Sequence, residues 1–222
     1  MYFVLFISIA LLSWAVSALL DHRFKKYAKV YLPLTGREVA EKMLRDHGIY
    51  DVQVTCTPGH LTDHYDPRNK TINLSEKVYN ANSVAAAAIA AHECGHAVQH
   101  AFAYGPLNMR STLVPVVNFA SQWVTWILLG GILMIETFPQ LLLIGIILYA
   151  LITLFAFITL PVEINASRRA VAWLEQAGIT DYQTTPMASS ALRSAAYTYV
   201  VAALSSLGTL IYYILIFTSR RD

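Results

Sequence analysis

Two long segments of the chain carry almost no charge, and they restrict the possible folds more than any other feature. Between Leu113 and Leu160 the only charged residue is Glu136, and from Ser194 to Phe217 there is none. A helix needs roughly 20 apolar residues to cross the hydrocarbon core of a bilayer. The whole chain follows the same trend, because 14% of its 222 residues are charged, against about 25% in a typical soluble domain. The sequence therefore predicts an integral membrane protein and argues against a disordered chain.

Four segments are long and apolar enough for membrane-spanning helices. The first has no basic residue before its apolar run and is longer than the core of a signal peptide, so we expect a retained anchor rather than a cleaved signal. The second and third are separated only by residues 136–138, which predicts an antiparallel helical hairpin over 113–160. The four predicted spans are residues 1–20, 113–135, 139–160 and 194–217.

Lysine and arginine residues near the ends of these spans predict the orientation in the membrane. Eight of them lie at one face, and two, Arg220 and Arg221, follow the last span in the tail 218–222. Because basic residues favour the cytoplasmic side, we expect the eight to be cytoplasmic and both chain ends to lie outside. The eight are Arg23, Lys25, Lys26, Lys29, Arg110, Arg168, Arg169 and Arg193. The net charge of +2 is too small to indicate a nucleic-acid partner.

The polar region 21–112 is the one part outside the spans that is large enough to fold as a small domain. Its patterns alternate between those typical of helices and those typical of strands, so we expect an α+β domain. The predicted elements are a helix over 38–46 opened by a capping box at Thr35 and Glu38, strands at Val52–Cys56 and Thr71–Leu74, and a helix over about 84–103 capped by Ser83.

The last of these helices carries the motif His92-Glu93-Cys94-Gly95-His96. His92 and His96 are one turn apart on one helical face, so their ring nitrogens can converge on a single zinc ion at about 2.0–2.1 Å. Glu93 can reach a water on that ion and accept its proton as a general base. A hydrolase needs all three residues at this spacing, and the motif predicts one Zn²⁺ per chain.

Two further residues of the same helix are not expected to bind the metal. His100 is roughly 12 Å along the helix axis from His92. Cys94 faces the other side of the helix, where we expect it to act as a small buried apolar residue. Two cysteines, Cys56 and Cys94, cannot form a disulfide framework, and free thiols are the simpler interpretation.

A catalytic zinc site keeps three protein ligands and one open position, so a third ligand must come from elsewhere. Glu163 follows the third predicted span, and Ala166 and Ala170 lie on the same helical face. Small residues there would let this helix approach the motif helix closely. The residues alone leave the choice open. The candidates are His60, His64 and Glu163 and, less well suited, Asp63 and Asp66.

The short strand before the motif helix is a candidate for binding substrate. Peptides commonly add as a strand to the exposed edge of a sheet, held by main-chain hydrogen bonds. Ile72, Asn73 and Leu74 are the residues in this position. A purely structural hairpin is the alternative interpretation.

The motif and its surroundings resemble a known family over nearly the whole chain. The segments that carry the resemblance are His92–His100, the pieces Tyr65–Pro67 and Ile72–Ser75 before it, and Leu160–Ala170 after it. Together they look like the bacterial membrane-bound neutral zinc metallopeptidases of the YugP-like family. More distantly they are similar to the HtpX-like and CAAX-prenyl membrane proteases, in which a glutamate on a later helix completes the zinc site.

Carried over to this sequence, the resemblance implies that Glu163 is the third ligand beside His92 and His96, with Glu93 as the general base. Such a set of ligands is called gluzincin-like. Ser167 stands where the distant relatives have an aspartate. Either Ser167, Asn165 or another residue must therefore orient the imidazole of a ligand histidine.

These expectations combine into one architecture. We expect a mainly α integral membrane protein with four transmembrane helices and a small α+β gluzincin-like zinc domain. Residues 161–193 are expected to form a cytoplasmic helix, which carries the third ligand and ends at Gly178, followed by a loop. The predicted function is that of a zinc metalloendopeptidase in the bacterial cell membrane, with its active site on the cytoplasmic face and a membrane-associated protein or peptide as substrate.

Two other classes of function compete with this prediction. A non-hydrolytic zinc-binding scaffold or regulator would have no use for Glu93, and its metal would be closed by a fourth protein ligand such as His60 or His64. A zinc transporter would need ionisable residues inside the spans. Only Glu136 lies near a span, at the tip of the hairpin, so the sequence argues against transport.

Overall fold

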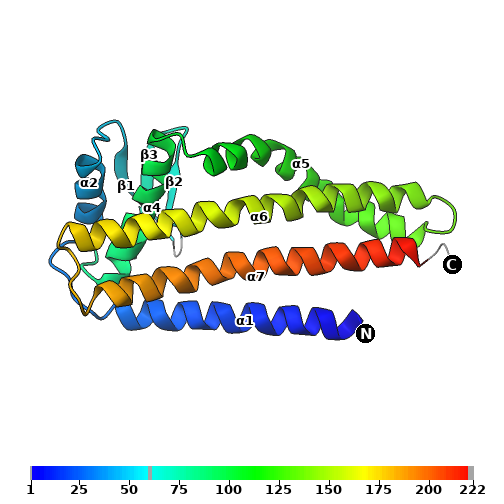
Figure 1. Ribbon diagram of the computed structural model, residues 1–222, viewed down its shortest axis with the longest axis horizontal. Coiled ribbons are helices and arrows are strands. Elements are labelled where there is room, and N and C mark those ends of the chain that lie inside the picture. The colour runs from blue at the N-terminus through cyan, green and yellow to red at the C-terminus, as the bar shows by residue number, and fades with distance from the viewer. Residues whose placement is uncertain (1, 60–61, 220–222) are drawn as a thin grey trace.

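Long helices run side by side along the longest dimension of the molecule, with a small three-stranded sheet near one end (Figure 1). The computed structural model describes residues 2–59 and 62–219. Its elements are, in chain order, α1 (Tyr2–Tyr27), α2 (Gly36–Asp46), β1 (Gln53–Thr57), β2 (His64–Asp66), β3 (Thr71–Ser75), α3 (Glu76–Tyr79), α4 (Val84–Ala101), α5 (Gly105–Leu133), α6 (Pro139–Gln176) and α7 (Thr185–Thr218).

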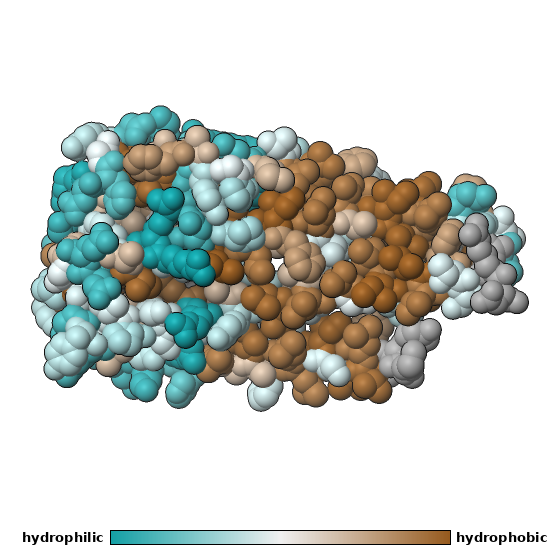
Figure 2. All heavy atoms as spheres, in the orientation of Figure 1, coloured by the Kyte–Doolittle hydropathy of each residue, from teal (hydrophilic) through white to brown (hydrophobic). Residues whose placement is uncertain are grey.

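Helices α1, α5, α6 and α7 are long and apolar enough to cross a membrane, and they coincide with the four predicted spans. Apolar residues cover the half of the molecule where these helices run alone, and polar residues cover the half that contains the sheet (Figure 2). The predicted hairpin is the pair α5 and α6. These helices approach closely at Gly131, where an added Cβ atom would lie 2.6 Å from the Cα atom of Leu142.

Two of these helices extend well beyond the predicted spans. Helix α6 continues through Pro161, which lacks a backbone N–H and usually ends a helix. It ends just before Gly178, whose φ of 64° is typical of a helix terminus. Helix α7 begins at Thr185, well before the predicted span at 194–217. The chain around Glu163 is therefore a direct continuation of the third membrane helix rather than a separate element.

The predicted caps and most of the predicted elements of the α+β region are confirmed. The hydroxyl of Thr35 accepts from the backbone N–H of Glu38, whose carboxylate accepts from the backbone N–H of Thr35. Ser83 caps α4 by accepting from the backbone N–H of Ala86. Strands β1 and β3 match the two predicted strands to within a residue. Strand β2 was not predicted.

The unpredicted strand changes the interpretation of the sheet. The strand order is β1-β3-β2, with β1 parallel and β2 antiparallel to β3. The expectation that Ile72, Asn73 and Leu74 form an exposed edge is therefore wrong, because they lie in the central strand and both sides of that strand are paired. Ile72 and Leu74 are fully buried. The unpaired edges of this sheet belong to β1 and β2.

The α+β region shares its hydrophobic core with the ends of α6 and α7. Met43 of α2 and Leu74 of β3 belong to the same buried cluster as Trp173 and Leu174 of α6 and Leu192 of α7. This continuity matters for the site, because it holds α4 firmly across α6 at the end of the membrane helices.

Candidate metal centre

His92 and His96 lie on the face of α4 that meets α6. Their rings pack edge to face, with centroids 4.8 Å apart. The Nε2 atom of His92 lies 3.3 Å, and that of His96 3.6 Å, from the same oxygen, Oε2 of Glu163. One ligand atom from each of the three residues lies within 4.8 Å of the others. The structure thus brings together the three residues that the resemblance implied as ligands.

Small residues allow this convergence. A Cβ atom added at Gly95 would lie 2.8 Å from the carbonyl oxygen of Ala166, which is closer than real Cβ contacts, and 3.1 Å from its Cα atom, which is tighter than most. Ala166 and Ala170 are fully buried, as expected from their position on the face of Glu163. The absence of a side chain at Gly95 therefore sets the distance between the motif helix and Glu163.

The environment of Glu163 fits a cation. Its side chain is 4% exposed, and its Oε2 atom accepts no hydrogen bond within residues 2–59 and 62–219. A buried carboxylate oxygen that accepts no hydrogen bond is unfavourable unless a cation lies beside it. Two imidazole nitrogens and one carboxylate oxygen that face the same space are the ligand set of many catalytic zinc sites. The donor chemistry of His92, His96 and Glu163 therefore suits a zinc ion.

A chain of hydrogen bonds orients the ring of His96. Its Nδ1 atom lies 3.0 Å from Oε1 of Gln99. The amide nitrogen of Gln99 donates to the carbonyl oxygen of Val162 at 2.8 Å and to Oδ1 of Asn165 at 3.0 Å, and Asn165 also accepts from Arg169. These bonds fix Oε1 of Gln99 as an acceptor. The hydrogen of His96 is thereby held on Nδ1, and Nε2 is left free to bind a metal.

Ser167 contacts the ring of His92, as Gln99 contacts the ring of His96. Its Oγ atom lies 3.1 Å from Nδ1 of His92. The sequence left open which residue orients the imidazole of a ligand histidine. In the structure Ser167 contacts His92 directly, and Asn165 contacts Gln99, which in turn contacts His96. Gln99 was not predicted for this role. Its position one turn after His96 on the same helix was the available signal.

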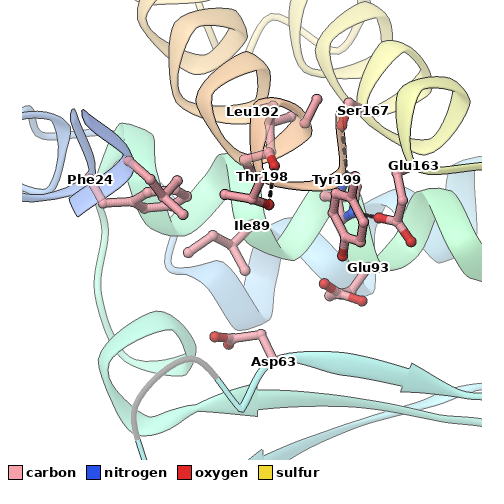
Figure 3. A pocket seen from close by; sticks show the side chains of 13 residues that line it. Phe24, Asp63, Ile89, Glu93, Glu163, Ser167, Leu192, Thr198 and Tyr199 are labelled. Atoms are coloured by element: carbon pink, nitrogen blue, oxygen red, sulfur yellow. Dashed lines mark hydrogen bonds and ion pairs between the residues drawn. The ribbon is translucent and has the colours of Figure 1, made fainter. Parts of the chain in front are cut away.

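Charged groups of both signs surround the centre. Glu93 is 9% exposed and lies beside Glu163 and Tyr199 (Figure 3). Burial disfavours the imidazolium form of His96, but the carboxylates of Glu163 and Glu93 outweigh this and raise the pKa of His96 in the metal-free protein. Arg110, expected only as a marker of orientation, places Nη1 3.8 Å from Oε1 of Glu163.

Two cavities of different character meet at this centre. One, of about 200 Å³, lies among α1, α4 and α7 and is walled by apolar side chains such as Phe24, Ile89 and Leu192 (Figure 3). The other, of about 530 Å³, lies between β2 and α5 and is lined mainly by polar side chains. The residues common to both are Asp63, His92, Glu93, Glu163 and Tyr199. Tyr199 belongs to α7, more than a hundred residues from the motif, and no sequence pattern indicated it.

The other candidate ligands that the structure describes are engaged elsewhere, and His60 lies outside the described residues. Each of them makes hydrogen bonds within the sheet region, and His100, which was not expected to bind the metal, contacts the sheet. The partners are Thr62 and Asn73 for His64, Ser75 for Asp63, Arg68 and Asn69 for Asp66, and Tyr65 for His100.

Cys94 occupies the position predicted for it. Its side chain is fully buried on the side of α4 that faces α2, and its Sγ atom lies 3.5 Å from the carbonyl oxygen of Ala40. Burial raises the pKa of this thiol well above its usual range. Cys56 is exposed, and neither cysteine forms a disulfide.

The fold and the site together combine four helices that are long and apolar enough to span a membrane with a candidate zinc centre near one end of them. A family model described as putative neutral zinc metallopeptidase matches residues 2–218, and the chain belongs to this family. It is also similar to a protein of Bacillus subtilis (strain 168) named putative membrane protease YugP, with 43% identity over 201 residues, which cover 90% of this chain and 88% of the relative. No solved structure matches the chain.

Proposed function

We propose that this protein is a zinc-dependent endopeptidase that hydrolyses peptide bonds close to the membrane surface. The observation that carries the proposal is the convergence of His92, His96 and Glu163 on one space, with Glu93 beside it. The names of the family and of the relative point to the same class of activity. Among the described residues, the cluster contains three potential ligands rather than four, which is the number expected of a catalytic rather than a structural site.

Each residue of the centre has a role in the proposed reaction. His92, His96 and Glu163 would hold the metal, which when bound polarises the scissile carbonyl group and makes water more acidic. Glu93 accepts a proton from the attacking water and then transfers it to the leaving amine. The hydroxyl of Tyr199 donates a hydrogen bond to the carbonyl oxygen as that oxygen becomes negative.

The position of the centre supports a membrane-associated substrate. Its apolar cavity lies beside α1 and α7, two helices long enough to span a membrane, and its polar cavity lies beside the sheet. A protein or peptide with an apolar part close to the membrane and a polar part outside it would match both. The excess of basic residues at this end of the helices favours the cytoplasmic face.

The proposal is tested by replacing Glu93 with glutamine in protein purified in detergent. We expect Glu93→Gln to keep its zinc and to lose about 10²–10⁴-fold in the rate of peptide hydrolysis, because the general base is gone. Glu76→Gln, an exposed carboxylate of α3, is the control and should remain fully active. Full activity in Glu93→Gln would refute the mechanism. A zinc-loaded wild type that cleaves no peptide would favour a non-hydrolytic scaffold.

Tyr199→Phe tests the proposed hydrogen bond to the carbonyl oxygen. Removing one such donor typically costs about 10²–10³-fold in kcat, and we expect kcat to fall while KM and zinc content stay the same. Tyr213→Phe on the same helix is the control, since Tyr213 lines neither cavity at the centre. Equal kcat values for the two variants would exclude the role given to Tyr199.

A further inference from the structure

A third cavity lies between α6 and α7, outside the candidate metal centre. It has a volume of about 510 Å³ and is lined only by residues of these two helices. We call it the α6–α7 groove. The residues used below are Ile164, Arg168 and Glu175 of α6 and Arg193, Tyr197 and Val200 of α7.

The chemistry of the α6–α7 groove changes along its length. The two helices run in opposite directions (Figure 1), so Ile164 and Val200 lie at the end of the groove nearer the apolar half of the molecule (Figure 2), and Glu175 lies at the opposite end. Arg168 and Arg193 come between these ends. The groove therefore offers apolar walls on the membrane side and two guanidinium groups above them.

Neither guanidinium group has a partner in the part of the chain that the structure describes. Arg168 and Arg193 are exposed and form no side-chain hydrogen bond or ion pair there, and Glu175 forms none with them. Other arginines of the protein are engaged: Arg169 donates to Asn165 and Arg23 to the carbonyl oxygen of Ser190. The two groove arginines thus remain available to an external anion.

The contact of Arg23 with Ser190 shows which part of α1 lies beside the α6–α7 groove. Ser190 is less than one turn from Arg193 in α7, about 4.5 Å along the helix axis. The basic end of α1, with Lys25 and Lys26, therefore lies at nearly the same level as Arg193. Basic residues that share one level beside apolar helices are typical of the region of lipid headgroups.

We propose that the α6–α7 groove binds an anionic phospholipid. The guanidinium groups of Arg168 and Arg193 take the phosphate, for which their planar donors are well suited. The hydroxyl of Tyr197 is a further donor to the headgroup. An acyl chain lies along Ile164 and Val200. This inference is independent of the proposed peptidase activity.

The test uses the full chain, purified in dodecyl maltoside with its zinc. Phosphatidylglycerol, phosphatidylcholine or inorganic phosphate is added, lipid binding is counted by native mass spectrometry, and thermal unfolding is followed in parallel. We expect phosphatidylglycerol to bind and to raise Tm, because a ligand that binds only the folded state stabilises it. Phosphatidylcholine and inorganic phosphate should have little effect.

The variant Arg168→Gln with Arg193→Gln should bind phosphatidylglycerol at least about tenfold more weakly. The matched control is Lys26→Gln with Lys29→Gln, which removes the same charge from exposed positions outside the groove, and its affinity should stay within about threefold of wild type. Unchanged zinc content shows that the variants are folded. If both double variants lost the same affinity for phosphatidylglycerol, the effect would come from general surface charge, and the proposal would be overturned. An equal effect of inorganic phosphate would overturn the assignment to a lipid.

Discussion

Both histidines of the candidate metal centre are held through the ring nitrogen that faces away from Glu163. Gln99 contacts Nδ1 of His96, and Ser167 contacts Nδ1 of His92. Contacts of this kind select the tautomer and the ring orientation that a metal needs, and their loss commonly costs 10–100-fold in metal affinity or activity. Gln99 is fully buried, so its amide has no water to replace its partners.

Replacing Gln99 by leucine tests this role. We expect Gln99→Leu to bind zinc about 10–100-fold more weakly, because the ring of His96 loses its acceptor while the volume of the side chain is nearly conserved. The dissociation constant is measured by competition with a chelator. Gln53→Leu, at an exposed position of β1, is the control. An affinity for Gln99→Leu equal to that of wild type would show that Gln99 serves only packing.

The raised pKa of His96 predicts opposite effects of pH on the metal-free and zinc-bound states. In the metal-free protein the charged form of His96 stabilises the fold. This contribution is complete below the unfolded-state pKa of about 6.5 and is lost as pH rises through the higher pKa of the folded state. Zinc needs the neutral imidazole, so its affinity increases over the same range.

From about pH 6 to about pH 8 we therefore expect the Tm of the metal-free protein to fall and its affinity for zinc to rise. Thermal unfolding in a chelator and zinc titration measure the two trends. Glu163→Gln serves as the control, since it removes a carboxylate that favours the charged form of His96, and the fall in Tm should be smaller in this variant. A metal-free Tm that rises with pH would show that the charged form of His96 does not stabilise the fold.

At the scale of elements, the contact between α4 and α6 positions the centre, and Gly95 is its critical residue. Gly95→Val would place new atoms against the backbone of Ala166. Overpacking of this kind typically costs about 1–3 kcal/mol, and here it also separates His92 and His96 from Glu163. We expect both a lower Tm and loss of most bound zinc. At Gly105, by contrast, an added Cβ atom meets nothing within 4 Å, so Gly105→Ala should keep both properties.

The elements that the sequence predicted are those with a strong local signal. The capping box at Thr35 and the cap at Ser83 satisfy donors of their own helices, so their effect is visible within a few residues. Strand β2 is three residues long, polar, and held by pairing with β3, which no local pattern reveals. The exposed edge expected at Ile72–Leu74 was wrong for this reason. Tyr199 and Arg110 reach the centre only because distant helices pack together.

At the scale of the whole molecule, the candidate zinc centre lies where the polar α+β region meets the long apolar helices. Two potential ligands come from the α+β region, and the third comes from the continuation of a membrane helix. Helices α1, α5, α6 and α7 have the length and apolar composition that the predicted four-span architecture requires. Because a zinc ion would link α4 to α6, we expect Glu163 to be required both for zinc binding and for the metal link between the α+β region and α6.

The most direct test of this claim is the zinc content of the detergent-purified wild type, Glu163→Ala and His64→Ala, measured by elemental analysis. We expect about one zinc ion per chain in the wild type and in His64→Ala, and almost none in Glu163→Ala, since two histidines alone hold zinc weakly. If Glu163→Ala kept its zinc while His64→Ala lost it, the metal would be bound wholly within the α+β region, and the link to the third membrane helix would be wrong.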